Sequence, residues 1–181
     1  MNNFNRPRYG RVSKEATALL RDNGVVSAPV PVDRLAESLG AKVVFNNFND
    51  EISGLLLRTE SSLIIGVAKE QPPARQRFTI AHEIGHILLH NFSDVHIDKN
   101  FAVMFRSAES STAQDILEIE ANTFAAELLM PESFIERELS NAVLDVEDDE
   151  QLRRLAKKYQ VSAQAMTYRL HNLMARHRLP V

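Results

Sequence analysis

The stretch FTIAHEIGH, residues 78–86, contains two histidines four positions apart, with a glutamate directly after the first. On an α-helix, residues i and i+4 lie on the same face, so His82 and His86 can approach one ion from the same side. Glu83 would then stand beside that ion without being one of its ligands. His-Glu-x-x-His at this spacing is typical of zinc peptidases, so the sequence predicts a metal site here.

The rest of this helix is apolar nearly all round, which predicts that the helix is buried. At about 100° per residue, one narrow polar strip remains, formed by Thr79, His82, Glu83, His86 and His90. Two neutral imidazoles and a carboxylate are costly to bury unless something pairs them, and a divalent metal would do so. The alternative is a core helix whose histidines are only hydrogen-bonded. His90 lies about 12 Å along the axis from His82, too far to share the ion, so we expect a structural role for it.

A catalytic zinc takes three protein ligands, so the sequence must supply one more. The segment Asp115–Met130 projects as a helix whose apolar stripe includes Glu118. A carboxylate within a buried stripe should be paired or metal-bound, which makes Glu118 the predicted third ligand. Glu120 is the alternative, although it falls with Glu127 on the polar side, where a solvated face is expected. Asn122, one turn after Glu118, is predicted to hold a ligand imidazole by a hydrogen bond.

These residues belong to longer blocks that resemble the ImmA/IrrE family of zinc metallopeptidases. The blocks follow the order of the family: Arg75 to His90, then Phe105-Arg106, then Glu118 to Pro131. A weaker resemblance extends to Val32–Ala36 and to Leu155–Leu173. In the family, the glutamate that begins the Glu-x-x-Ala-Asn pattern is the third zinc ligand, which corresponds to Glu118. The resemblance also implies a substrate: a helix-turn-helix repressor of the Xre type, whose cleavage relieves repression of DNA-damage, mobile-element or defence genes.

Length and composition fit one domain with a substantial core. The chain has 181 residues, is 44% hydrophobic, and contains six glycines and seven prolines. It has no cysteine, so disulfides and cysteine-ligated metals are excluded. No apolar run reaches the roughly 18 residues of a membrane span, and the polar start MNNFNRPRYG lacks a signal core. We therefore expect a soluble, cytoplasmic protein.

The segments around the motif predict an α+β fold with a small, mostly antiparallel sheet. Two helices and then three β-like runs are expected, at Ser13–Asp22, Asp33–Leu39, Lys42–Phe48, Gly54–Thr59 and Leu63–Ala68. Because the runs are close together in sequence, we expect them to pair antiparallel. Phe101–Arg106 is a candidate edge strand, and a sheet edge beside a metal could hold an extended peptide. We place a zincin-like metallopeptidase core in residues 1–131 and a helical C-terminal region in residues 132–181, packed on the core as one unit.

Charge divides the last third of the chain into two parts. Residues 132–150 carry eight acidic side chains and one arginine, whereas residues 151–181 carry seven Lys or Arg and no acid. Leu152–Tyr159 and Ala163–Met174 are predicted helices that resemble a helix-turn-helix, with Ser162 as an N-cap and Gln160 where the turn usually has glycine. This pair could bind nucleic acid, for example single-stranded DNA as an activator. The favoured alternative is that it simply closes the peptidase core, because no base-reading side chains can be identified.

The expected mechanism is that of a gluzincin-like metalloendopeptidase, with zinc at His82, His86 and Glu118 and with Glu83 as general base and then general acid. Such a site also accepts manganese or cobalt. The sequence does not identify the group that stabilises the oxyanion. Four candidates for it are Tyr159, Tyr168, His171 and His96. Two other functions stay open, namely a DNA-binding regulator with a structural metal and a general peptidase or toxin-system component.

Overall fold

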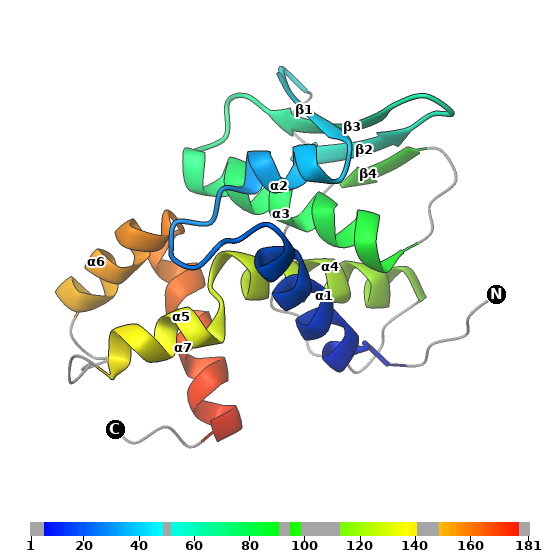
Figure 1. Cartoon of the computed structure of the whole chain (residues 1–181). Coiled ribbons are helices and arrows are strands. Elements are labelled where there is room, and N and C mark those ends of the chain that lie inside the picture. Colours follow the sequence, from blue (N-terminus) through cyan, green and yellow to red (C-terminus); the bar gives the residue numbers. More distant parts are fainter. Residues whose placement is uncertain (1–5, 49–51, 91–94, 99–112, 141–148, 178–181) are drawn as a thin grey trace.

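The fold combines helices with one small sheet in an α+β arrangement (Figure 1). The structure is a computed structural model that describes residues 6–48, 52–90, 95–98, 113–140 and 149–177. In chain order its elements are α1 (Tyr9–Asp22), α2 (Val32–Ser38), β1 (Ala41–Asn46), β2 (Gly54–Arg58), β3 (Leu63–Ala68), α3 (Pro73–Leu89), β4 (Val95–Asp98), α4 (Ala113–Leu129), α5 (Glu132–Leu139), α6 (Asp149–Tyr159) and α7 (Ala163–His177).

The described sheet has four strands in the order β1-β3-β2-β4 and is mixed. Strands β2 and β3 form an antiparallel hairpin, closed by the hydrogen bond from Thr59 N to Ser62 O at 2.8 Å. Strand β1 instead pairs with β3 in parallel, so the prediction of antiparallel pairing is wrong for β1. The physical reason is loop length: only the four-residue loop forces a hairpin, whereas the longer connection after β1 lets the chain cross to the far side of β3.

Strand β4 pairs antiparallel with β2 and is the outermost strand of the described sheet on that side. No strand is predicted at this position from the sequence. The candidate edge strand Phe101–Arg106 lies outside the described residues. Two of the three observed strand pairings are therefore antiparallel.

Helix α3 lies at the centre of the molecule, with the sheet on one side and α4 on the other (Figure 1). The two helices lie close together at Gly85, where an added Cβ would stand 3.2 Å from Ala121 Cα. Helix α1 covers another side of α4, and α2 packs on β1 and α3. Because helix α3 is covered on two sides, its apolar circumference is satisfied by packing, as its sequence predicts.

The C-terminal helices α6 and α7 are joined by a short turn and pack on each other. Gln160 adopts a φ of 55° in this turn, the left-handed conformation that usually calls for glycine. The predicted N-cap is confirmed, since Ser162 Oγ accepts a hydrogen bond from Ala165 N at 3.1 Å. Arg169 of α7 donates to Met130 O at 3.0 Å, at the end of α4. The domain boundary at residue 131 stays a prediction.

The first helix is longer than predicted, since it begins at Tyr9 and ends at the predicted residue, Asp22. Gly24, one residue after the C-cap Asn23, has a φ of 65° and takes the left-handed conformation that ends such helices. Within the described residues, no helix has both the length and the apolar character needed to cross a membrane.

Candidate metal centre

Helix α3 carries the His-Glu-x-x-His motif deep inside the protein. Every residue from Phe78 to His86 is buried, and the exposed fraction is 1% for His82, 0% for Glu83 and 0% for His86. The predicted burial of this helix is therefore confirmed. Because imidazoles and a carboxylate are costly to bury alone, their partners decide what the site can do.

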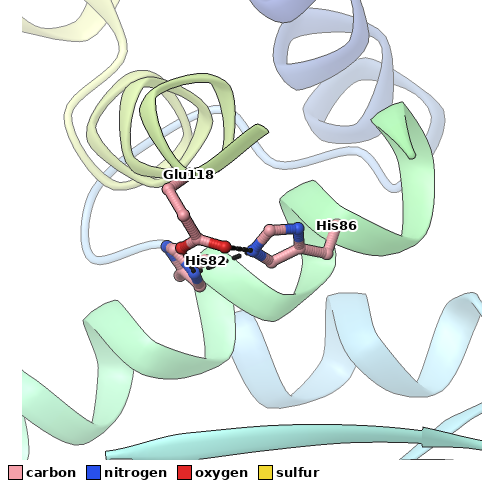
Figure 2. Close-up of side chains that lie close together, drawn as sticks. All are labelled: His82, His86 and Glu118. Atoms are coloured by element: carbon pink, nitrogen blue, oxygen red, sulfur yellow. Dashed lines mark hydrogen bonds and ion pairs between the residues drawn. The ribbon is translucent and has the colours of Figure 1, made fainter. Parts of the chain in front are cut away.

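Three side chains from two helices converge on one point, with Glu118 of α4 facing both histidines of α3 (Figure 2). His82 Nε2 and His86 Nε2 lie 2.9 Å apart. The Glu118 carboxylate lies 3.3 Å from His82 Nε2 through Oε2 and 3.5 Å from His86 Nε2 through Oε1. In a tetrahedral zinc site with bonds of about 2.0–2.1 Å, neighbouring donor atoms are about 3.3 Å apart. The donor set and its spacing therefore fit a zinc ion.

Asn122 and His90 decide which nitrogen of each histidine carries its proton. Asn122 Oδ1 lies 2.9 Å from His82 Nδ1, so this nitrogen donates its proton and leaves the Nε2 lone pair directed at the cluster. His86 Nδ1 meets His90 Nδ1 at 2.9 Å instead. The expected contact between Asn122 and an imidazole is present, and its role in holding a bound metal stays a prediction.

Glu83 lies against strand β2, beside the three converging donors but not among them. A Cβ built on Gly54 would stand 3.0 Å from Glu83 Oε1, so the backbone of β2 touches this carboxylate. Only glycine leaves room for this approach. From its sequence, Gly54 is predicted only as the start of a strand, because the pattern of a strand does not show which side chains it will face.

The structure corrects the prediction for the second face of α4. A solvated face is predicted for Glu120 and Glu127, but their exposed fractions are 0% and 7%. Glu118, predicted to be buried, instead leaves 18% of its side chain accessible. The reason is that helix α1 packs on α4. It covers the face of α4 that carries polar residues in the sequence and is therefore expected from the sequence to face solvent. The alternative ligand Glu120 does not join the converging donors.

The buried carboxylate of Glu120 forms an ion pair with Arg8, the residue that precedes α1, whose side chain is 18% exposed. The backbone N–H and Nε of Arg8 donate to Oε1 at 2.6 and 2.9 Å, and Nη2 donates to Oε2 at 2.5 Å. His90 Nε2 lies 3.0 Å from Oε2 of the same carboxylate. Burial raises the pKa of Glu120, but the hydrogen bonds from Arg8 and His90 outweigh it and bring the pKa to about 2. Glu120 is therefore ionised.

Glu127 joins three helices through its carboxylate. Ser13 Oγ of α1 donates to Oε2 at 3.0 Å, and Arg169 and Arg176 of α7 donate to Oε1 at 3.2 and 3.3 Å. Two acidic residues seven positions apart lie on the same side of a helix, and that spacing was the only sequence signal for this second buried face. Their basic partners come from both ends of the chain, so the sequence alone could not pair them.

The four candidates for oxyanion stabilisation differ in surroundings. Tyr159 is fully buried, and its pKa is raised to about 12 by burial and by Glu138. Tyr168 and His171 are exposed on α7. The side chain of His96 lies outside what the structure describes. Their assignment as oxyanion-stabilising groups stays a prediction.

Three relatives match this chain over part of their length. It is 37% identical over 98 residues to the radiation response metalloprotease IrrE of Deinococcus radiodurans, and the matched region covers 54% of this chain and 27% of that protein. It is 33% identical over 107 residues to the protein of the same name in Deinococcus deserti, covering 59% and 35%. It is 30% identical over 98 residues to the uncharacterized immunity region protein 2 of Bacillus phage phi105, covering 54% and 57%. The matched region thus spans from about a quarter to little more than half of these relatives.

A solved structure described as a Mycobacterium tuberculosis transcriptional regulator is similar in fold, with a TM-score of 0.60 at 17% identity. The likeness covers 88% of this chain and 46% of that one, and at this identity it shows the fold alone. The family model described as the IrrE N-terminal-like domain, Peptidase_M78, matches residues 36–171. This range includes His82, His86 and Glu118. The chain therefore belongs to the IrrE-like Peptidase_M78 family of metalloproteases.

Proposed function

We propose that this chain is a zinc-dependent endopeptidase that cleaves a helix-turn-helix repressor and so relieves repression of stress, mobile-element or defence genes. The observation that carries the proposal is the convergence of His82, His86 and Glu118 at 2.9–3.5 Å. Two imidazoles and one carboxylate leave a fourth position of a tetrahedral ion open, as catalytic zinc sites do, whereas structural sites fill all four. Family membership supports the same conclusion.

Each residue of the site has its own task in this proposal. His82, His86 and Glu118 hold the ion, and Asn122 keeps the His82 ring turned towards it. Zinc bound there supplies Lewis acidity for a peptide carbonyl and for water. Glu83, held between α3 and β2, accepts the proton of the attacking water and passes it to the leaving amine. Because Gly54 and α3 enclose this carboxylate, its position is set by packing.

A peptide substrate fits the arrangement of the sheet. Strand β4 is outermost in the described sheet, and it pairs with β2, whose Gly54 touches Glu83. An extended segment that paired along this edge would run past the candidate site. The choice of a repressor as the protein that supplies this segment comes from the resemblance to the ImmA/IrrE family. Because such repressors act in the cytoplasm, we propose that location for the reaction.

A role for single-stranded DNA as an activator is a separate part of the proposal, and the exposed cations of α6 support it only weakly. Arg154 pairs with Glu150 at 3.0 Å and Lys158 with Glu138, which leaves Arg153 and Lys157 as the other exposed cations of α6. Phosphate contacts by so few cations would be weak and sensitive to salt. Any effect of DNA on cleavage should therefore disappear at high salt.

The test is to incubate the zinc-loaded chain with the helix-turn-helix repressor encoded beside it, with and without single-stranded DNA, and to measure intact masses. Glu83→Gln is the matched control, because it keeps the shape and leaves the three predicted ligands in place. Zinc content is measured for both proteins.

One discrete cut that disappears in Glu83→Gln would support a dedicated repressor protease. If zinc were bound and the repressor stayed whole in every condition, the substrate proposal would be wrong. Cleavage of unfolded proteins alone would then favour a general peptidase. Sequence-specific DNA binding with an affinity that Glu83→Gln leaves unchanged would favour a regulator with a structural metal.

A further inference from the structure

A continuous row of polar groups, buried except for the partly exposed Arg8 at its far end, runs from the candidate metal centre to the start of helix α1. His86 Nδ1 lies 2.9 Å from His90 Nδ1, and His90 Nε2 lies 3.0 Å from Glu120 Oε2. Glu120 in turn accepts three hydrogen bonds from Arg8. The exposed fraction is 0% for His86, 8% for His90 and 0% for Glu120. Four residues from three parts of the chain are thus joined in one line.

The charge at the far end of this row fixes the direction of every hydrogen bond in it. The Glu120 carboxylate is paired with the Arg8 guanidinium, so it can only accept, and His90 must donate from Nε2. A neutral imidazole has one donor and one acceptor nitrogen, so His90 Nδ1 then accepts. His86 Nδ1 therefore donates, and its Nε2 lone pair faces His82 and Glu118.

The opposite direction would prevent metal binding. If His90 carried its proton on Nδ1, that N–H would face His86 Nδ1 at 2.9 Å and would require an acceptor there. The His86 proton would then move to Nε2, the atom that lies 2.9 Å from His82 Nε2 and 3.5 Å from Glu118 Oε1. A protonated Nε2 has no lone pair for an ion. The carboxylate of Glu120 excludes this arrangement.

We propose that His90 and Glu120, anchored by Arg8, are positioning residues that hold His86 in the tautomer and ring orientation that metal binding needs. The inference rests on the proposed zinc site and adds residues to it that touch neither metal nor substrate. The tautomer of His82 is set by a single hydrogen bond to Asn122, whereas that of His86 depends on three further residues, His90, Glu120 and Arg8. Arg8 lies outside residues 36–171, the range that the family model matches. The segment before α1 therefore contributes to the site.

The experiment measures the zinc affinity of the full chain by competition with a chromophoric chelator. His90→Leu removes the acceptor for His86, and Glu120→Gln replaces a pure acceptor by an amide that can also donate. Loss of such supporting contacts typically lowers metal affinity about 10–100-fold, and we expect that range for both variants. His90→Asn keeps an oxygen near the position of Nδ1, so we expect it to recover a large part of the affinity.

Glu127→Gln is the matched control, because Glu127 is also a buried α4 carboxylate held by arginines, seven residues after Glu120. It should lower the stability of the zinc-free protein as Glu120→Gln does, yet leave zinc affinity unchanged. Circular dichroism shows which variants are folded. The visible spectrum of the cobalt-loaded proteins reports the ligand geometry directly and should change in His90→Leu but not in Glu127→Gln.

The outcomes separate this inference from the proposed function. If the wild-type chain bound zinc tightly and both His90→Leu and Glu120→Gln bound it equally well, the positioning role would be wrong while the peptidase proposal stood. An equal loss of affinity in Glu127→Gln would also overturn it, since any buried charge would then have the same effect. A wild-type chain that bound no zinc would overturn the proposed function and this inference together.

Discussion

Replacing Gly54 by alanine should disturb Glu83, because strand β2 touches helix α3 at this residue. The new Cβ would come within 3.0 Å of Thr79 Cγ2 and would stand 3.0 Å from Glu83 Oε1, and both residues are 0% exposed. Carbon atoms in contact normally lie about 3.5–4.0 Å apart, so strand and helix would have to separate by about 0.5 Å or more. Such overpacking lowers the free energy of unfolding by about 1–3 kcal/mol. Alanine offsets about 0.5–1 kcal/mol of this loss, because it has less conformational entropy than glycine in the unfolded chain. We expect the free energy of unfolding to fall by about 1–2 kcal/mol.

The same change should slow cleavage more than it weakens substrate binding. A misplacement of about 1 Å in a catalytic group can cost about 100-fold in rate, so a smaller shift of Glu83 should lower kcat by roughly 10-fold or more. KM should change little, because in the proposed mechanism Glu83 acts on water and on the leaving amine and does not bind the substrate. Urea denaturation gives the stability, and initial rates of repressor cleavage by the zinc-loaded protein give kcat and KM.

Thr79→Ser provides the matched control, because it removes only the Cγ2 methyl that the new Cβ would meet. In the double variant Gly54→Ala/Thr79→Ser, stability should recover by about 1 kcal/mol relative to the sum of the single changes. The rate should recover less, since the contact with Glu83 remains. A Gly54→Ala variant as stable and as active as the wild type would refute the reasoning, and so would strictly additive effects of the two changes.

Three further predictions concern the turn, the core and the metal. Gln160→Gly should raise the free energy of unfolding by about 1 kcal/mol, because the left-handed φ of 55° costs glycine nothing, and an unchanged urea midpoint would contradict this. Burial and Glu138 raise the pKa of Tyr159 to about 12, above its ordinary value, so its contribution to stability is complete below pH 10 and is lost as the pH rises towards 12. Tyr159→Phe should therefore lose less stability between pH 10 and pH 12 in urea denaturation, whereas equal losses would argue against a buried phenol. Zinc at about 1,000 times its Kd should stabilise the wild-type chain by about 4 kcal/mol, and calorimetry should show a far smaller rise in Tm for Glu118→Gln.

Local geometry explains what could be predicted about the candidate metal centre. His82, Glu83 and His86 lie within five consecutive residues, and helical spacing alone places both histidines on one face. The apolar circumference of α3 similarly predicted its burial. Glu118 is predicted as a ligand because it falls within the apolar stripe of the projected helix and begins the Glu-x-x-Ala-Asn pattern of the family, and Asn122 is predicted to support a ligand imidazole because it lies one turn later. The structure brings all of these residues except Glu83 into direct contact across the α3 and α4 interface.

The sequence by itself determined the elements that depend on short-range periodicity: the motif helix, the first two helices, the runs that became strands and the helical pair near the C-terminus. Only the tertiary structure decided that β1 pairs in parallel, that Gly54 touches Glu83, and that Glu120 and Glu127 are buried. These features depend on which segments meet across large separations in sequence, such as the 112 positions between Arg8 and Glu120. A helix projection shows which residues share a face, but what covers that face is set by the packing of the whole chain.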